Sequence, residues 1–128
     1  MPRIADFIVI ADGPITLPDQ SGIGINDIHI QVSDPPNVDT TLRSILVFQV
    51  DPHPIPIRLG VALNDINVLD HTFRTDPVRS WHLAIPANVL RPHQNELSMA
   101  ALNIPEAEGN QGVIRISNVV LFFHANIP

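Results

Sequence analysis

The sequence predicts an all-β protein, a sandwich of two antiparallel sheets of the jelly-roll type. Thirteen prolines and six glycines are spread over 128 residues, which leaves few windows for an uninterrupted helix. Between these breaks, hydrophobic residues recur with a period of two, as they do in strands that bury one face. Roughly eight such segments, separated by turns every 8 to 12 residues or so, are typical of sandwiches.

The first half of the chain supplies three predicted strands. Phe7 to Ile10 is a short apolar run that we expect to pair near the last strand of the chain. Ile28 to Val32 alternates hydrophobic residues with His29 and Gln31, so it predicts a half-buried strand. Ser44 to Val50 is apolar at both odd and even positions, which predicts a central strand covered on both sides.

The middle of the chain predicts a hairpin and a further strand. Ile55 to Leu63 alternates over its whole length, and Pro56 suggests that this strand begins at a sheet edge. Asn64-Asp65 follows it and tolerates left-handed backbone, so it predicts the hairpin tip. Trp81, Leu83 and Ile85 then share one face of the next strand, which predicts that Trp81 packs on the core.

The last third contains one ambiguous segment. Asn95 to Leu102 is rich in helix formers, but its alternate residues share a hydrophobic face and nearby prolines leave little room, so we predict a strand. Pro86 to Pro92 allows at most one helical turn. Val113 to Phe123 is apolar at both parities and predicts a second doubly covered central strand. Asn103 to Gln111 is one of the two longest polar loops.

Composition limits the classes of function. The chain has the size of one domain, residues 1–128, with 45% hydrophobic and 16% charged residues. Seven arginines, no lysine and thirteen acids give a net charge of -6 without a cationic stripe, which argues against nucleic acid and anionic membranes. No apolar run approaches the roughly 20 residues that span a bilayer, so we expect no membrane insertion.

The chain contains no cysteine, which suits a reducing compartment. Asp6 interrupts the apolar run near the N-terminus and argues against a signal peptide. We therefore expect a soluble, cytoplasmic protein, while secretion without a classical signal peptide stays open.

Several segments resemble the galactose-binding-like sandwiches, a superfamily that includes many carbohydrate-binding modules. The resemblance covers roughly residues 57 to 123. It rests on Leu59-Gly60-Val61-Ala62-Leu63-Asn64-Asp65, Arg79-Ser80-Trp81-His82-Leu83-Ala84-Ile85-Pro86, Leu90-Arg91-Pro92-His93-Gln94-Asn95-Glu96-Leu97 and Ile116-Ser117-Asn118-Val119-Val120-Leu121-Phe122. Asp65 replaces the glycine that often follows the hairpin Asn of the family. The resemblance implies the fold and a carbohydrate ligand, although most of these motifs are structural.

Polar residues around the predicted hairpin and the following strands are the candidate ligand-binding residues. Side chains of this kind fix sugar hydroxyls by hydrogen bonds, and the chain is too poor in aromatic residues to offer a flat stacking platform. The candidates are Asn64, Asp65, Asp70, His71, Arg74, Arg79 and His82.

Metal and catalytic motifs are weak. Asp65, Asn67 and Asp70 offer oxygen ligands for calcium, but their spacing does not match a calcium loop. The six histidines show no zinc-binding spacing. Glu106 and Glu108 are the nearest match to a catalytic carboxylate pair, and no nucleophile elbow or phosphate-binding loop is present in the sequence. We expect no catalytic residue and no cofactor, with weak calcium binding as the exception to test.

These observations favour a non-catalytic, lectin-like carbohydrate-binding module. A self-assembling structural or protein-interaction domain is the main alternative, and a sandwich-type hydrolase is the third. A homo-oligomer is expected in either of the first two cases. Ile114, Ile116, Val120 and Phe122 share one parity of the last segment, and Val119, Leu121 and Phe123 share the other. One core cannot hold both sets in a straight strand, so a second subunit would cover one of them.

Overall fold

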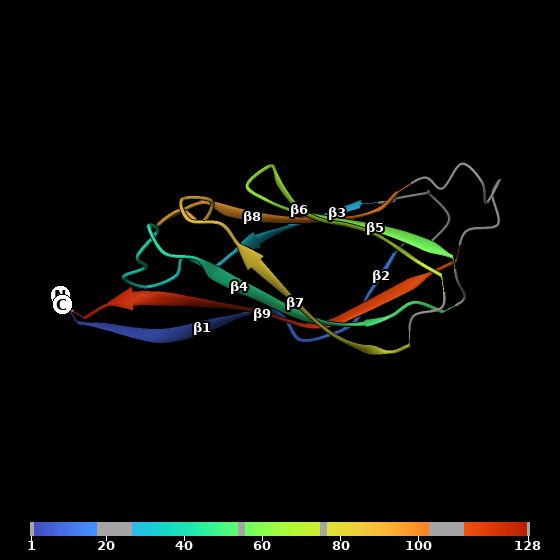
Figure 1. Ribbon diagram of the computed structural model, residues 1–128, viewed down its shortest axis with the longest axis horizontal. Helices are drawn as coiled ribbons and strands as arrows, with labels where there is room; N and C mark the ends of the chain where they lie inside the picture. The colour runs from blue at the N-terminus through green and yellow to red at the C-terminus, as the bar shows by residue number, and fades with distance from the viewer. Residues whose placement is uncertain (1, 18–26, 54–55, 75–76, 103–111, 128) are drawn as a thin grey trace.

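The computed structural model describes residues 2–17, 27–53, 56–74, 77–102 and 112–127. Within these ranges the chain forms nine strands and no helix. The strands make two antiparallel sheets that pack face to face around one hydrophobic core (Figure 1). The prediction of an all-β, two-sheet sandwich is therefore confirmed.

The five-stranded sheet has the order β1-β9-β4-β7, and a short strand, β2, also pairs with β9. Its strands are β1 (Arg3–Ala11), β2 (Ile15–Leu17), β4 (Ser44–Asp51), β7 (Arg79–Ile85) and β9 (Ile114–Asn126). The four-stranded sheet has the order β3-β8-β5-β6. Its strands are β3 (Asp27–Val32), β5 (Ile57–Leu63), β6 (Ile66–Phe73) and β8 (Asn95–Leu102).

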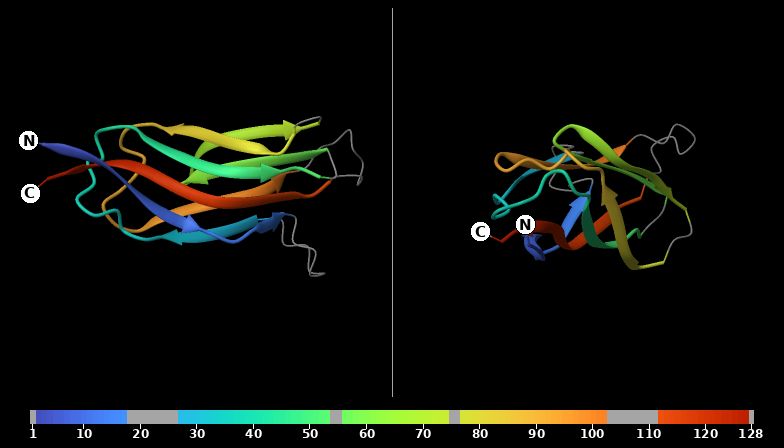
Figure 2. Two further views of the ribbon diagram at one scale, coloured as in Figure 1. Left: turned by 90° about the horizontal axis from the view of Figure 1, so that it is seen from below. Right: turned by 60° about the vertical axis from the view of Figure 1, so that its left-hand side comes forward.

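The strand order is that of a jelly roll. Apart from β2 and the β5–β6 hairpin, successive strands alternate between the two sheets, and every pairing within the sheets is antiparallel. The orders 1-9-4-7 and 3-8-5-6 are those of an eight-stranded double-sheet jelly roll, with β2 added. The expected pairing of the first strand with the last is confirmed, because β1 lies beside β9 and brings both termini to one end (Figure 2).

The core is built from the inward positions of both sheets. Leu46 on β4 lies between Leu83 on β7 and Leu121 on β9, and all three are buried. Met99 on β8 and Val61 on β5 form the equivalent buried pair in the other sheet. This strict alternation is why the period-two pattern located most of the strands correctly.

Within one chain, neither of the two strands predicted to be covered on both sides is covered on its outer face. In β9 a bulge at Asn118, whose φ is 52°, places one extra residue against β4. The register with β1 also shifts by one residue, but there the extra residue is Ile10 on β1. Ile114 and Ile116 before the bulge therefore face the same core as Val119 and Leu121 after it. The outer face of β4 is likewise uncovered, since Ile45 is 46% exposed.

Other expectations are settled by the pairing. Asn95–Leu102 is a strand, as predicted. Asn64 and Asp65 form the hairpin tip, and both have positive φ, 51° and 66°, as a type I′ turn requires. Pro56 does not mark an edge strand, because β5 begins at Ile57 and pairs with β6 and β8 on its two sides. Ile55 lies outside the described residues.

Trp81 packs on the core at the edge of the five-stranded sheet, as predicted. It is paired with the buried Phe48 across the β4–β7 ladder. Its ring lies 5.5 Å from Phe73 and 4.9 Å from His71, both on β6 of the opposite sheet. The Arg79 guanidinium lies 4.6 Å above the Trp81 ring, so this half-buried indole joins the two sheets.

Candidate functional site

The outer face of the four-stranded sheet carries a shallow groove that follows the strands. Its floor consists of small residues on the two central strands, namely Gly60, Ala62, Ser98 and Ala100. Its walls are polar residues on the two edge strands, namely Asp27, His29, Asn67 and Asp70. The strand register places Asp27, Ala100, Gly60 and Asp70 in one row, and His29, Ser98, Ala62 and Asn67 in the next. We call this hollow the outer groove.

One wall of the outer groove holds a histidine between two carboxylates. Nδ1 of His29 lies 2.9 Å from Oε1 of Glu96, and Nε2 lies 3.1 Å from Oδ2 of Asp27. Hydrogen bonds to Glu96 and then to Asp27 raise the pKa of His29 above its ordinary value. In its protonated form the imidazole donates to both carboxylates and so joins β3 to β8 along this wall.

The opposite wall carries a paired acid. Arg58 donates from Nε to Oδ1 of Asp70 at 2.8 Å and from Nη2 to Oδ2 at 2.7 Å. This two-pronged contact lowers the pKa of Asp70. Beside it, the side chain of Leu102 lies over Gly60, where an added Cβ would come 2.8 Å from Leu102 Cδ1. A larger residue at Gly60 would therefore displace the Leu102 side chain, which closes this end of the groove.

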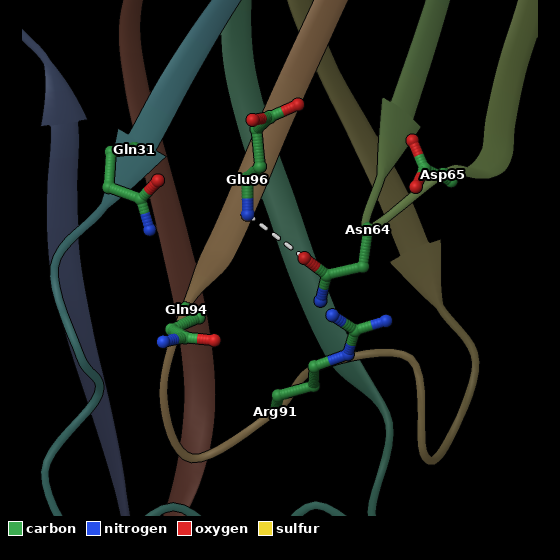
Figure 3. A pocket seen from close by; sticks show the side chains of 6 residues that line it. All are labelled: Gln31, Asn64, Asp65, Arg91, Gln94 and Glu96. Carbon is green, nitrogen blue, oxygen red and sulfur yellow. Dashed lines mark hydrogen bonds between the residues drawn. The ribbon is translucent and has the colours of Figure 1, made fainter.

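A second hollow adjoins the outer groove where the strands reach the β5–β6 turn. We call it the end pocket, and all six of its lining residues are polar (Figure 3). They are Gln31, Asn64, Asp65, Arg91, Gln94 and Glu96. Glu96 links the two hollows, because it lines the end pocket and also holds His29 in the groove wall.

The end pocket is built on two buried asparagines. Asn64 donates from Nδ2 to the Val89 carbonyl and to Oδ1 of Asn95, both at 2.8 Å. Its Oδ1 accepts the Glu96 backbone N–H at 2.9 Å, the contact drawn in Figure 3. These bonds join the hairpin tip to the loop before β8, so the pocket walls are held rigidly before any ligand arrives.

Arg91 is positioned by the same network. Its backbone N–H donates to Oδ1 of Asn95 at 2.8 Å, and its carbonyl accepts from Nδ2 of Asn95 at 2.7 Å. Its guanidinium points into the end pocket below Asn64 (Figure 3). No described residue forms a hydrogen bond or ion pair with this guanidinium, so its donors face the pocket.

The seven predicted ligand-binding residues do not form one surface. Asn64 and Asp65 line the end pocket, and Asp70 lines the outer groove. His71 follows Asp70 on β6 and points to the opposite face, where its ring lies 4.6 Å from the buried Phe73.

The remaining three candidates lie elsewhere. Arg79 covers Trp81 at the edge of the five-stranded sheet, and Arg74 is exposed just after β6. His82 is exposed on the outer face of the five-stranded sheet, in the row that contains Val47. Among the seven, the structure therefore brings only Asn64 and Asp65 into one hollow, while Asp70 lines the adjoining groove.

The sequence analysis missed most of the polar lining. Gln31, Glu96 and His29 occupy outward positions of strands whose inward residues had been identified, so strand parity could have placed them on this face. Arg91 and Gln94 lie in a loop whose path depends on the buried Asn95. Only a structure places those two beside the hairpin.

Metal and catalytic candidates receive no assembled site in the described part of the chain. Asp70 of the calcium candidates is bound by Arg58. Among the described residues, no group of three or more His, Asp or Glu side chains is arranged to hold a metal ion. Glu106 and Glu108 lie outside the described residues.

Comparisons with known proteins leave the function to be argued from geometry. No protein-family model matches this chain, and no curated protein matches it in sequence. In the described residues, no helix is long and apolar enough to cross a membrane.

Proposed function

We propose that this chain is a non-catalytic carbohydrate-binding module whose ligand lies in the end pocket and extends toward the outer groove. The observation that carries the proposal is the rigid end pocket itself. Around the buried Asn64 it gathers the Arg91 guanidinium, the side-chain amides of Gln31 and Gln94, and two carboxylates in one hollow. Neighbouring sugar hydroxyls each need a donor and an acceptor, and this mixture supplies both.

The charges of the pocket favour a neutral sugar. Asp65 and Glu96 line it together with Arg91, so its acids outnumber its guanidinium, while the whole chain carries a charge of -6. A phosphate or sulfate would meet repulsion there, whereas a hydroxyl donates readily to either carboxylate. No Phe, Tyr or Trp side chain is among the described residues that line either hollow, so recognition is by hydrogen bonds rather than ring stacking.

The sequence resemblance to galactose-binding-like sandwiches supports the same ligand class. Two of the residues that carry this resemblance, Asn64 and Asn95, are the buried, hydrogen-bonded pair that holds the pocket walls. In this proposal the two asparagines position Asp65, Arg91 and Gln94, and these three residues contact the sugar.

A glycan array, probed with and without calcium, tests the proposal. We expect neutral glycans to be retained and expect Arg91→Ala to weaken the best of them by about tenfold, or about 1.4 kcal/mol, in titration calorimetry. Arg115→Ala is the matched control, since Arg115 is an exposed arginine on the other sheet. The proposal fails if no glycan is retained in either buffer, or if the two variants lose affinity equally.

A further inference from the structure

The outer face of the five-stranded sheet is apolar in its middle. Strand register aligns Phe7, Phe122, Ile45 and Ala84 in one row across β1, β9, β4 and β7. Val9, Val120, Val47 and His82 form the next row. Phe7 is 56% exposed, Val9 49%, Ile45 46% and Phe122 42%, so this surface faces solvent in one chain. We call these rows, without His82, the apolar face.

The apolar face combines two protruding rings with a neighbouring hollow. The rings of Phe7 on β1 and Phe122 on β9 lie 5.9 Å apart, and across the same row the outward side chains shrink to Ile45 and then to Ala84 on β7. The hollow lies beside this row, and its lining crosses all four strands from Ala5 on β1 to Ala84 on β7. The hollow is mostly apolar, with Arg43 and His124 at its margin.

This shape is what a symmetric pair of identical surfaces needs. A two-fold axis parallel to the strands and between β9 and β4 lays β1 of one chain over β7 of the other. Phe7 then enters the hollow beside the partner's Ala84, Phe122 meets the partner's Ile45, and Val120 meets the partner's Val47. The same axis places Val9 opposite the partner's His82. Each of the two phenylalanine rings thus faces a smaller side chain, and the sheets pack in the aligned manner of a sandwich.

We propose that the apolar face binds a second copy of this chain in that two-fold arrangement. The polar ends of the face fit the rim of such an interface. Arg43 and His124 lie at one end. At the other end Asn118 donates to Oε1 of Gln49 at 2.7 Å. The inference does not depend on carbohydrate binding, because the outer groove lies on the opposite face of the sandwich and stays open in both copies.

Engineered cysteines test the arrangement, since the natural chain contains none. In Phe7→Cys/Ala84→Cys the two thiols of one chain are three strand spacings apart, about 14 Å, which excludes a disulfide within the chain. The proposed pair instead brings each Cys of one copy to the other Cys of its partner. We expect mild oxidation to give a covalent dimer from the double variant and almost none from Phe7→Cys alone. Equal crosslinking of the two variants, or no crosslinking of the double variant, overturns the arrangement.

Solution mass tests the interface independently of thiol chemistry. Light scattering after size exclusion should give about twice 14.1 kDa for the natural chain at micromolar concentration. Phe7→Glu should reduce the mass to one chain, because it places a carboxylate in the apolar hollow of the partner. Ile66→Glu is the control, as Ile66 is 49% exposed on the other sheet, and should keep the double mass. A natural chain that stays at one-chain mass, or an unchanged mass of Phe7→Glu, overturns the proposal.

Discussion

The two outer faces of this sandwich share one fold and differ in chemistry. On the four-stranded sheet the central strands carry Gly60, Ala62, Ser98 and Ala100, so the middle is hollow and the polar edges stand above it. On the five-stranded sheet the central strands β4 and β9 carry Ile45, Val47, Val120 and Phe122 at the equivalent outward positions.

The inward positions show no such contrast. Both sheets fill the core with Leu, Ile, Val, Met and Phe. Outward side chains are not fixed by core packing, so they are the positions at which one jelly roll acquires two different surfaces. We propose ligand contact for the polar face and pairing of two chains for the apolar face.

The largest expected effect concerns the core between the two faces. Trp81→Ala removes the ring that contacts Phe73 and His71 across the sandwich. We expect it to lower the free energy of unfolding by about 3 kcal/mol, the low end of the range for large aromatic residues because Trp81 is half-buried. Urea unfolding measures this change, and Trp81→Phe should lose less. A stable Trp81→Ala variant that loses sugar binding would instead make Trp81 a ligand platform.

A smaller change in stability distinguishes the buried asparagines that hold the end pocket from the exposed residues that line it. Asn64→Ala leaves the Glu96 N–H and Val89 carbonyl without their side-chain partner, so we expect unfolding to become easier by about 1 to 3 kcal/mol. Asp65→Ala, one residue further along, should change stability by about 0.5 kcal/mol or less, because Asp65 is exposed. Equal losses in thermal unfolding would contradict the buried asparagine network.

The smallest expected effect concerns the pKa of His29 in the wall of the outer groove. The pKa of His29 should lie above 6.5 in NMR titrations, and Glu96→Gln should lower it more than Asp27→Asn, because Glu96 is the stronger cause. Since the folded-state pKa is the higher one, this cluster stabilises the fold below pH 6.5 and stops doing so as the pH rises through that pKa. A His29 pKa unaffected by either change would show that the wall is not held by these hydrogen bonds.

Much of the fold could be predicted because strand alternation reports burial directly. It identified Asn95–Leu102 as a strand against its helix-forming composition, and the left-handed tolerance of Asn64 and Asp65 located a turn. It failed on β9, where the extra residue at Asn118 reverses the parity halfway along. A single asparagine in the sequence does not reveal a bulge, because the bulge depends on the register between β9 and β4.

The candidate site was less predictable for a related reason. Asp70 and His71 are adjacent in sequence, yet they lie on opposite faces of β6, and strand parity alone would have separated them. The sequence predicted that Asn64 contacts a ligand. In the structure its amide forms the hydrogen bonds that hold the pocket. The joining of Arg91 and Gln94 to Gln31 depends on contacts between distant segments.

The division of work between the two faces can be tested in a single NMR series on the isotopically labelled chain. Dilution should shift the backbone amides of Phe7, Ile45 and Ala84, which lie in the proposed pairing surface. Addition of the best glycan from the array should shift those of Gln31, Asp65, Arg91 and Gln94 and leave the first group unmoved. The account would be contradicted if the glycan shifted the amides of Phe7 and Ile45 and left those of the end-pocket residues unchanged.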